Sequence, residues 1–168
     1  MATVHFKGTS ASTAGELPAL GSQAPSFELS QTDLSRINLE SFKGKKLILN
    51  IFPSVDTGTC AQSVRTFNHE AAELDTTAVL CISKDLPFAQ NRFCGAEGIE
   101  NVIMLSDYMN DNFGKDYGIR FIDGPFEGLL ARAVVVIDKE GKTVHSELVS
   151  NISDEPNYKA ALEALYNG

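Results

Sequence analysis

The 168-residue sequence predicts an α/β fold in which a mixed central β-sheet carries helices on both faces. Short apolar runs rich in β-branched residues alternate with helical patterns over residues 47–106, as expected of parallel strands joined by helices. An antiparallel hairpin over residues 131–149 and a closing helix follow. This order of elements favours a thioredoxin-like sandwich. Because no internal repeat or linker interrupts the pattern, one domain is expected over residues 1–168.

The central strand is predicted at Leu47–Phe52, a short and mostly apolar run typical of a strand buried between two helical layers. Pro53 ends this strand, since proline cannot donate to a β-ladder. A short turn then leads to Thr59, which is followed three residues later by Gln62. This capping-box spacing predicts that Thr59 is the N-cap of a helix and that Cys60 is its first residue.

The other elements are predicted from hydrophobic periodicity and from turn residues. An N-terminal β-hairpin extension and a loop precede strands expected at 26–29, 34–39, 78–83 and 102–106, and helical segments are expected at 60–75, 85–94, 112–117 and 156–166. In the second helical segment, Asp85 is expected to cap the N-terminus, and Pro87 to lie in the first turn. Gly95 is expected just beyond its end, so that Cys94 lies at the helix C-terminus.

The charge balance argues against several classes of partner. The chain has 22 acidic and 14 basic residues, so no basic stripe indicates nucleic acid or an anionic membrane as partner. No apolar run reaches the ~18 residues that a membrane span requires, and no basic leader precedes an apolar core. A cytoplasmic location is therefore expected. Three cysteines are too few for a secreted disulfide scaffold, which favours a catalytic use of the thiols.

Cys60 is the strongest candidate for a reactive residue. A thiol in the first turn of a helix lies beside unpaired N–H groups and a partial positive charge, so it ionises more easily. When partly exposed, such a thiolate attacks peroxides and becomes a sulfenic acid, with which a second thiol can condense to a disulfide. Cys94, at the opposite end of its own helix, is the candidate second thiol. Cys81 lies inside a buried strand and is expected to be structural.

Other thiol and metal chemistries do not fit the spacing. A dithiol oxidoreductase places Cys-x-x-Cys at the helix start, but Ser63 stands where the second cysteine would be. His5, His69 and His145 are scattered and have no ligand at suitable spacing, so neither a metal nor a cofactor is expected. One alternative to an enzyme stays open: the same two thiols could act as a redox sensor or binding module that switches a partner interface.

Three segments resemble a known family. Pro53, Thr57 and Cys60 match the Pro-x-x-x-Thr-x-x-Cys signature of peroxiredoxins, and the string PSVDTGTC is similar to the thiol peroxidase subfamily. DLPFAQNRFCGAEG, residues 85–98, resembles the surroundings of that subfamily's resolving cysteine. ARAVVVID, residues 131–138, resembles the strand that carries the family's active-site arginine. The similarity extends over nearly the whole chain.

The resemblance implies an atypical two-cysteine peroxidase that reduces hydrogen peroxide and organic hydroperoxides. It implies a cytoplasmic homodimer that is recycled by thioredoxin. Cys60 would be the peroxidatic thiol and Cys94 the resolving thiol, joined during turnover by an intramolecular disulfide.

The resemblance also implies roles for the residues around the thiol. Thr57 would hydrogen-bond the sulfur and the peroxide oxygen, and Pro53 would shield the thiolate from water. Arg132 would hold the thiolate and polarise the O–O bond. Arg65 and Arg120 remain alternatives to Arg132.

Overall fold

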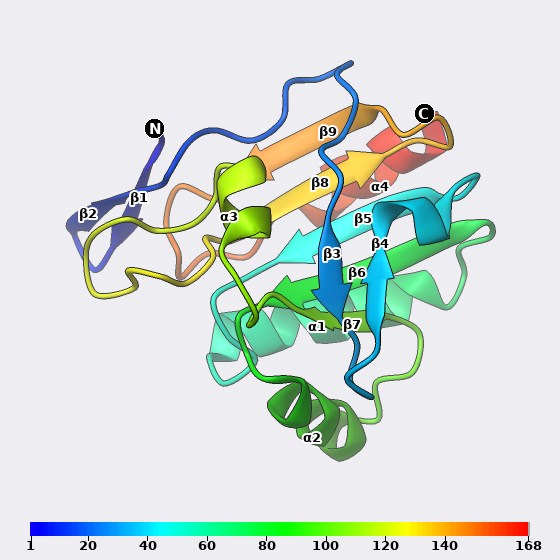
Figure 1. The fold of residues 1–168 in the computed structure, drawn as a ribbon, viewed down its shortest axis with the longest axis horizontal. Coiled ribbons are helices and arrows are strands. Elements are labelled where there is room, and N and C mark those ends of the chain that lie inside the picture. The colour runs from blue at the N-terminus through cyan, green and yellow to red at the C-terminus, as the bar shows by residue number, and fades with distance from the viewer. Residues whose placement is uncertain (168) are drawn as a thin grey trace.

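The structure, a computed structural model, describes residues 1–167 and is built around a seven-stranded β-sheet (Figure 1). The strands β5, β6 and β7 are parallel, and antiparallel strands extend the sheet on both sides. In spatial order the strands are β4 (Arg36–Asn38), β3 (Glu28–Ser30), β7 (Ile103–Ser106), β6 (Thr77–Ser83), β5 (Lys46–Ile51), β8 (Ala133–Ile137) and β9 (Thr143–Leu148). The predicted mixed sheet is confirmed.

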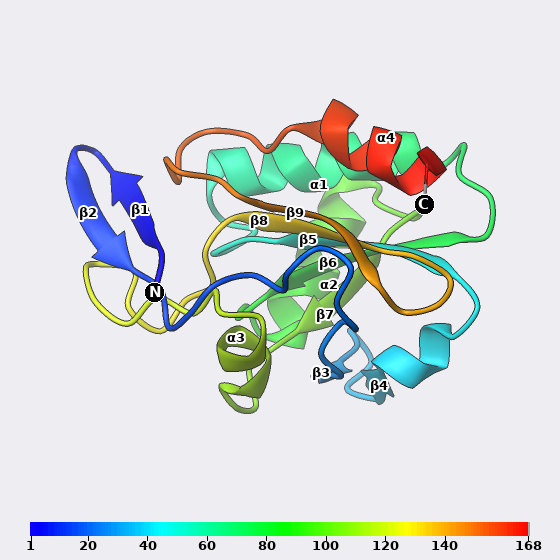
Figure 2. The same cartoon turned by 90° about the horizontal axis from the view of Figure 1, so that it is seen from above.

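Helices cover both faces of the sheet, and Figure 2 shows α1 and α4 on one side and α3 on the other. The helices are α1 (Gly58–Ala71), α2 (Pro87–Glu97), α3 (Asn112–Asp116) and α4 (Tyr158–Asn167), with a 3₁₀ turn η1 (Leu39–Phe42). In β5, Leu49 and Ile51 belong to the core on the α3 side, whereas Ile48 and the following Phe52 belong to the core on the α1 side. Both faces of β5 are therefore buried, which explains its nearly continuous apolar sequence.

The predicted N-terminal hairpin is confirmed as a separate two-stranded sheet of β1 (Thr3–Phe6) and β2 (Thr9–Ser12). Lys7 and Gly8 form its turn with φ angles of 47° and 82°, the positive values that a two-residue hairpin turn favours. His5 attaches the hairpin to the main sheet body: its amide donates to Ser150 O at 2.8 Å, and its carbonyl accepts from Ile152 N at 2.9 Å. The hairpin thus holds the segment that follows β9.

The predicted start of the first helix is wrong by two residues. Thr57, with extended backbone angles, is the N-cap of α1, and Cys60 is the third helical residue. The amide of Ala61 already donates to Thr57 O at 3.0 Å, so the helical hydrogen bonds begin before Thr59. The Thr59 hydroxyl donates instead to Ser153 O at 3.0 Å, a tertiary contact that the capping-box pattern does not reveal.

Both ends of α2 also differ from the prediction. The N-cap is Leu86 and not Asp85, although Pro87 does occupy the first turn as predicted. Gly95 is helical, and α2 continues to Glu97. The helix ends at Gly98, whose φ of 66° is the left-handed conformation that glycine adopts most easily.

The remaining predicted strands and helices are found within a few residues of their expected ends. The closing helix α4 begins at Tyr158, two residues after Pro156, and α1 ends at Ala71. Among residues 1–167, none of the helices combines the length and the apolar character needed to cross a membrane.

Candidate active site

Cys60 lies in the first turn of α1, beyond the end of β5, and its exposed fraction is 0%. Phe52 and Val55 from the preceding loop and Val64 from α1 belong to the same apolar cluster. The expectation of a partly exposed thiol is therefore wrong for this structure. The loop from Phe52 to Thr57 folds over the start of the helix and contributes apolar cover that the helical pattern alone does not show.

Arg132 brings a cation to this sulfur. Because β8 is antiparallel to β5 and Ala133 pairs with Ile51, the residue before β8 lies at the end of β5 where α1 begins. Arg132 Nη2 donates to Cys60 Sγ at 3.3 Å. Arg132 Nε and Nη2 also donate to Ile152 O, at 3.2 and 2.8 Å, which fixes the plane of the guanidinium.

The charge of Arg132 is buried, with an exposed fraction of 2%. None of the carboxylates in residues 1–167 lies within ion-pair distance of it. A buried cation without an anionic partner destabilises the folded state. Removing one partner of a buried ion pair, which leaves such a charge, costs ~3–5 kcal/mol of stability. The Cys60 sulfur is the polar atom of the apolar cluster that this guanidinium contacts.

Arg65 and Arg120 do not serve this purpose. The Arg65 guanidinium is about half exposed on α1 and bonds Glu97 of α2. Arg120 Nε lies 3.5 Å from Asp111 Oδ1. Of the three arginines that the sequence left as candidates, the structure brings Arg132 to the thiol.

Thr57 and Pro53 flank the thiol on the loop between β5 and α1. Pro53 is buried just after the end of β5. The hydroxyl of Thr57 donates to Ser54 O at 3.2 Å, and since a hydroxyl has one proton, it does not donate to the Cys60 sulfur here. The expected bond from Thr57 to the sulfur is thus absent from this structure, and the Thr57 oxygen keeps lone pairs that can accept a hydrogen bond.

The other two thiols lie in different surroundings, and all three cysteines are free. Cys94 is half-buried in the last turn of α2, where it packs against the cluster that contains Cys60. Burial raises the pKa of Cys94 above its ordinary value. Cys81 is completely buried in β6, and burial raises its pKa to about 12. Both thiols therefore stay protonated at neutral pH.

Two polar residues behind Cys60 were missed by sequence reasoning. Ser63 Oγ donates to Cys60 O at 2.7 Å, and Asn50 Nδ2 donates to Ser63 Oγ at 3.2 Å. Both side chains are completely buried and hold the first turn of α1 to β5. The sequence did contain one signal for this pair. Asn50 is a lone amide within an otherwise apolar strand, and a buried polar group needs a hydrogen-bond partner.

Residues 1–167 contain no cluster of three or more His, Cys, Asp or Glu side chains that is arranged to hold a metal ion. His5 and His69 are exposed, and His145 is half-buried on β9.

Comparisons with known proteins agree with this geometry. The model of the Redoxin family matches residues 19–162. A thiol peroxidase from Mycobacterium tuberculosis is 57% identical over 98% of this chain and 99% of its own length. A thiol peroxidase from Corynebacterium glutamicum is 54% identical over the same shares of the two chains. The crystal structure of a peroxiredoxin-like protein from Aquifex aeolicus superposes with a TM-score of 0.93, at 35% identity, and covers 98% of this chain and 96% of that one.

The thioredoxin-like fold predicted from the sequence is confirmed by these structural matches. The chain belongs to the Redoxin family, and within it to the thiol peroxidase subfamily of the peroxiredoxins.

Proposed function

We propose that this protein is a thiol peroxidase that reduces hydrogen peroxide and organic hydroperoxides at Cys60. The observation that carries the proposal is the 3.3 Å contact between Arg132 Nη2 and Cys60 Sγ in the first turn of α1. A fixed cation and a helix N-terminus both favour the thiolate, which is the form that attacks peroxides. The names of the relatives that are 54–57% identical to the chain support the same activity.

In the first step, the Cys60 thiolate attacks the terminal oxygen of the peroxide, and the O–O bond breaks. The sulfur keeps that oxygen as a sulfenic acid, and the second oxygen takes a proton from water, which replaces the one that Cys60 released on ionisation, and leaves as water or an alcohol. Arg132 Nη1 is buried and has no hydrogen-bond partner among residues 1–167, so it can donate to the leaving oxygen as negative charge develops. The Thr57 hydroxyl oxygen accepts a hydrogen bond from the bound peroxide, and Pro53 limits the access of water.

In the second step, Cys94 attacks the Cys60 sulfenic acid, and water leaves as the intramolecular disulfide forms. The raised pKa of the half-buried Cys94 thiol keeps it from competing for peroxide. A dithiol such as that of thioredoxin then reduces the disulfide by exchange and restores both thiols. We place this cycle in the cytoplasm, where a thioredoxin system supplies the electrons, and in a homodimer.

The test is steady-state turnover. NADPH consumption with hydrogen peroxide or a bulky alkyl hydroperoxide, thioredoxin and thioredoxin reductase is expected to continue over many equivalents. One equivalent of disulfide without cycling would instead support a redox sensor. A Cys60 that does not react with peroxide at neutral pH would contradict both functions.

A further inference from the structure

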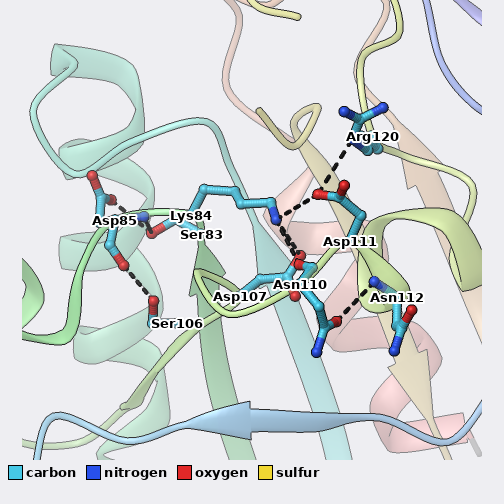
Figure 3. A network of polar contacts seen from close by, with 9 residues as sticks. All are labelled: Ser83, Lys84, Asp85, Ser106, Asp107, Asn110, Asp111, Asn112 and Arg120. Atoms are coloured by element: carbon cyan, nitrogen blue, oxygen red, sulfur yellow. Dashed lines mark hydrogen bonds and ion pairs between the residues drawn. The ribbon is translucent and has the colours of Figure 1, made fainter. Parts of the chain in front are cut away.

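Asp85 joins the loop that leads to Cys60 to the strand that precedes α2. Its carboxylate accepts three hydrogen bonds: Ser54 Oγ donates to Oδ1 at 2.7 Å, and Val55 N and Ser83 Oγ donate to Oδ2 at 2.9 and 2.6 Å. Ser106 Oγ donates to the Asp85 carbonyl, and Figure 3 shows Asp85 between Ser83 and Ser106. Asp85 therefore does not cap α2, because both of its carboxylate oxygens are engaged by neighbouring segments.

The hydrogen bonds that Asp85 accepts from Ser54 and Val55 hold the shape of the loop before α1. The side chain of Ser54 is held on two sides, since its Oγ also accepts from Asp56 N at 3.1 Å. The Ser54 carbonyl in turn accepts from the hydroxyl and the amide of Thr57, both at 3.2 Å. The orientation of the Thr57 hydroxyl thus depends on Ser54, and the position of Ser54 depends on the carboxylate of Asp85.

The same polar link continues toward the helix that carries Cys94. Ser83 Oγ, which donates to Asp85, accepts from Gln90 Nε2 at 3.2 Å. Gln90 Nε2 also donates to Leu105 O at 2.9 Å, and its side chain is completely buried on α2. The packed position of α2 and the shape of the loop before Cys60 are therefore connected through one aspartate.

We propose that Asp85 is a positioning residue for the peroxidase reaction. It acts through Ser54 to aim the Thr57 hydroxyl at the place where the peroxide binds, and it does not touch the reacting atoms itself. Hydrogen bonds to a carboxylate are about twice as strong as bonds between neutral groups, which suits a loop that must stay in one shape. The proposal rests on the assigned role of Cys60 and adds a residue that holds the peroxide-binding geometry.

The test separates the reaction with peroxide from the general reactivity of the thiolate. In a Cys94→Ser background, the rate of Cys60 oxidation by hydrogen peroxide is measured alongside the pH profile of Cys60 alkylation by iodoacetamide. Asp85→Ala is expected to slow oxidation by at least about tenfold, the factor that one lost charged hydrogen bond produces. Alkylation should keep its rate and its pH midpoint, because it needs the thiolate beside Arg132 but not the Thr57 hydroxyl.

Two further variants keep the test decisive if Asp85→Ala does not fold. Asp85→Asn keeps the size of the side chain and one acceptor for Val55 N–H, so its oxidation rate should lie between those of the wild type and the alanine variant. Ser54→Ala removes the donor of the hydrogen bond to Asp85 Oδ1 and leaves the carboxylate in place. Combining Ser54→Ala with Asp85→Asn should slow oxidation by less than the product of the two single effects, because both changes weaken the same link.

Asp138→Ala is the matched control. Asp138 also accepts two main-chain N–H bonds in a turn, from Glu140 and Lys142 at 2.9 Å each, but it follows β8 at the end of the sheet away from Cys60. In the Asp138→Ala variant, hydrogen peroxide should oxidise Cys60 at the wild-type rate.

Wild-type oxidation rates in the Asp85 and Ser54 variants would overturn the proposal. So would alkylation rates that fall in proportion to oxidation, since that result indicates a general loss of structure. If the parent protein itself fails to react with peroxide, the proposed function is wrong, which is a different outcome from an Asp85 variant that reacts normally.

Discussion

Cys60, Cys81 and Cys94 carry the same side chain, but their sulfur atoms have different neighbours. Arg132 donates to Cys60, whereas Asn50 Nδ2 lies 3.7 Å from Cys81 and supplies no charge. Burial raises the pKa values of Cys81 and Cys94, and no cation opposes this effect at either thiol. These different surroundings support the proposal that Cys60 is the thiol that reacts with peroxide.

The first prediction concerns the division of labour between the two working thiols. Cys60→Ser should abolish peroxide consumption, whereas Cys94→Ser should still consume one equivalent and form a sulfenic acid. Without a resolving thiol, that acid should persist and be oxidised further to the sulfinic acid. Intact-protein mass spectrometry after graded additions of peroxide follows each species. Cys81→Ser is the control and should keep full turnover, and equal loss of the first oxidation in all three variants would contradict the assignment.

The second prediction concerns the guanidinium. Arg132→Met keeps an unbranched side chain in the site but removes the cation that contacts Cys60 Sγ. Oxidation by peroxide should slow by about 10²–10³-fold, as when one preorganised electrostatic donor is lost. The reaction of Cys60 with iodoacetamide at neutral pH should slow as well, because the sulfur loses its neighbouring cation. Arg65→Met, on the surface of α1, should change neither rate. Unchanged rates of oxidation and alkylation in Arg132→Met would exclude the assigned role.

The third prediction concerns Asp107, a carboxyl with 3% exposure that lies 3.6 Å from Lys84 Nζ. Burial raises its pKa to about 7, and the nearby Asp111 carboxylate adds to this effect, against the opposing influence of Lys84. The folded protein therefore holds a proton that the unfolded chain releases at about pH 4. Since the folded state binds more protons between these values, the contribution of Asp107 to stability falls as the pH rises from 4 to 7.

Asp107→Asn removes this titration. Relative to the wild type, the variant should gain stability between pH 4 and pH 8, by up to about 4 kcal/mol in the free energy of unfolding. Urea unfolding of both proteins at several pH values measures the difference. Asp154→Asn, at an exposed position, should not alter the pH dependence. A difference between wild type and Asp107→Asn that is constant across this range would show that Asp107 titrates as it does in the unfolded chain.

At the level of elements, α2 is held to its neighbours by three buried side chains, those of Pro87, Gln90 and Phe93, and by ion pairs at the surface. Arg92 pairs with Asp56 at 3.2 Å, and Arg65 pairs with Glu97, in both cases with exposed side chains. Exposed ion pairs contribute about 0.2–1 kcal/mol each, so they restrain the helix weakly. Neither helix has a side-chain hydrogen bond at its N-cap, but α1 is longer and packs Val64 and Phe67 into the core, among other residues. Of the two helices that carry the reacting thiols, α2 is the one that can unpack.

The fourth prediction is that the disulfide requires this unpacking. A disulfide brings the two Cα atoms to about 4.4–6.8 Å. Cys60 is enclosed in the core, and Cys94 sits on the last turn of another helix. Amide exchange around residues 88–95 should therefore be faster in the oxidised protein than in the reduced one, because the opened helix loses its protecting hydrogen bonds. Exchange in α4 should be the same in both states, and identical exchange at residues 88–95 would show that the site stays rigid.

Across the whole molecule, several large apolar side chains are exposed around the start of α2 and the loop after β7. These two segments are neighbours, because Asp107 N donates to Ser83 O at 2.9 Å and Lys84 Nζ donates to Asn110 O at 2.7 Å (Figure 3). The exposed side chains are Leu86, Phe88, Tyr108 and Met109. Apolar side chains gathered in this way are typical of surfaces that bind another protein, and they support the proposed homodimer.

The fifth prediction tests that dimer. Phe88 is 66% exposed on α2, and Phe88→Glu should shift the protein from dimer to monomer in light scattering coupled to gel filtration, because a charge would be buried in the interface. Tyr166→Glu, an equally exposed aromatic position on α4, should leave the dimer intact. A dimer that withstands Phe88→Glu would place the interface elsewhere.

Many strands and helices could be predicted because their sequence signals are local. Each signal depends on residues a few positions apart, as in the apolar run of β5, the turn residues of the 131–149 hairpin and the helical face of α1. The ends of α1 and α2 could not be predicted in the same way. Thr59 and Asp85 have the residue types of N-caps, but Ser153 and Ser54 engage their side chains instead. A capping pattern in the sequence indicates only that a residue type favours the N-cap position. A hydrogen bond to a residue distant in the sequence can outweigh that preference.

The sequence by itself determined the order of strands and helices, the placement of Cys60 in the first turn of a helix, and the resemblance that singled out Arg132. Only the tertiary structure decided which arginine reaches the sulfur, how deeply Cys60 is buried, and that Asp85 holds the loop before it. Cys60 and Arg132 are 72 positions apart, and they meet because β8 runs antiparallel to β5 with Ala133 opposite Ile51. Strand pairing of this kind depends on side chains from the whole core, so no local pattern contains it.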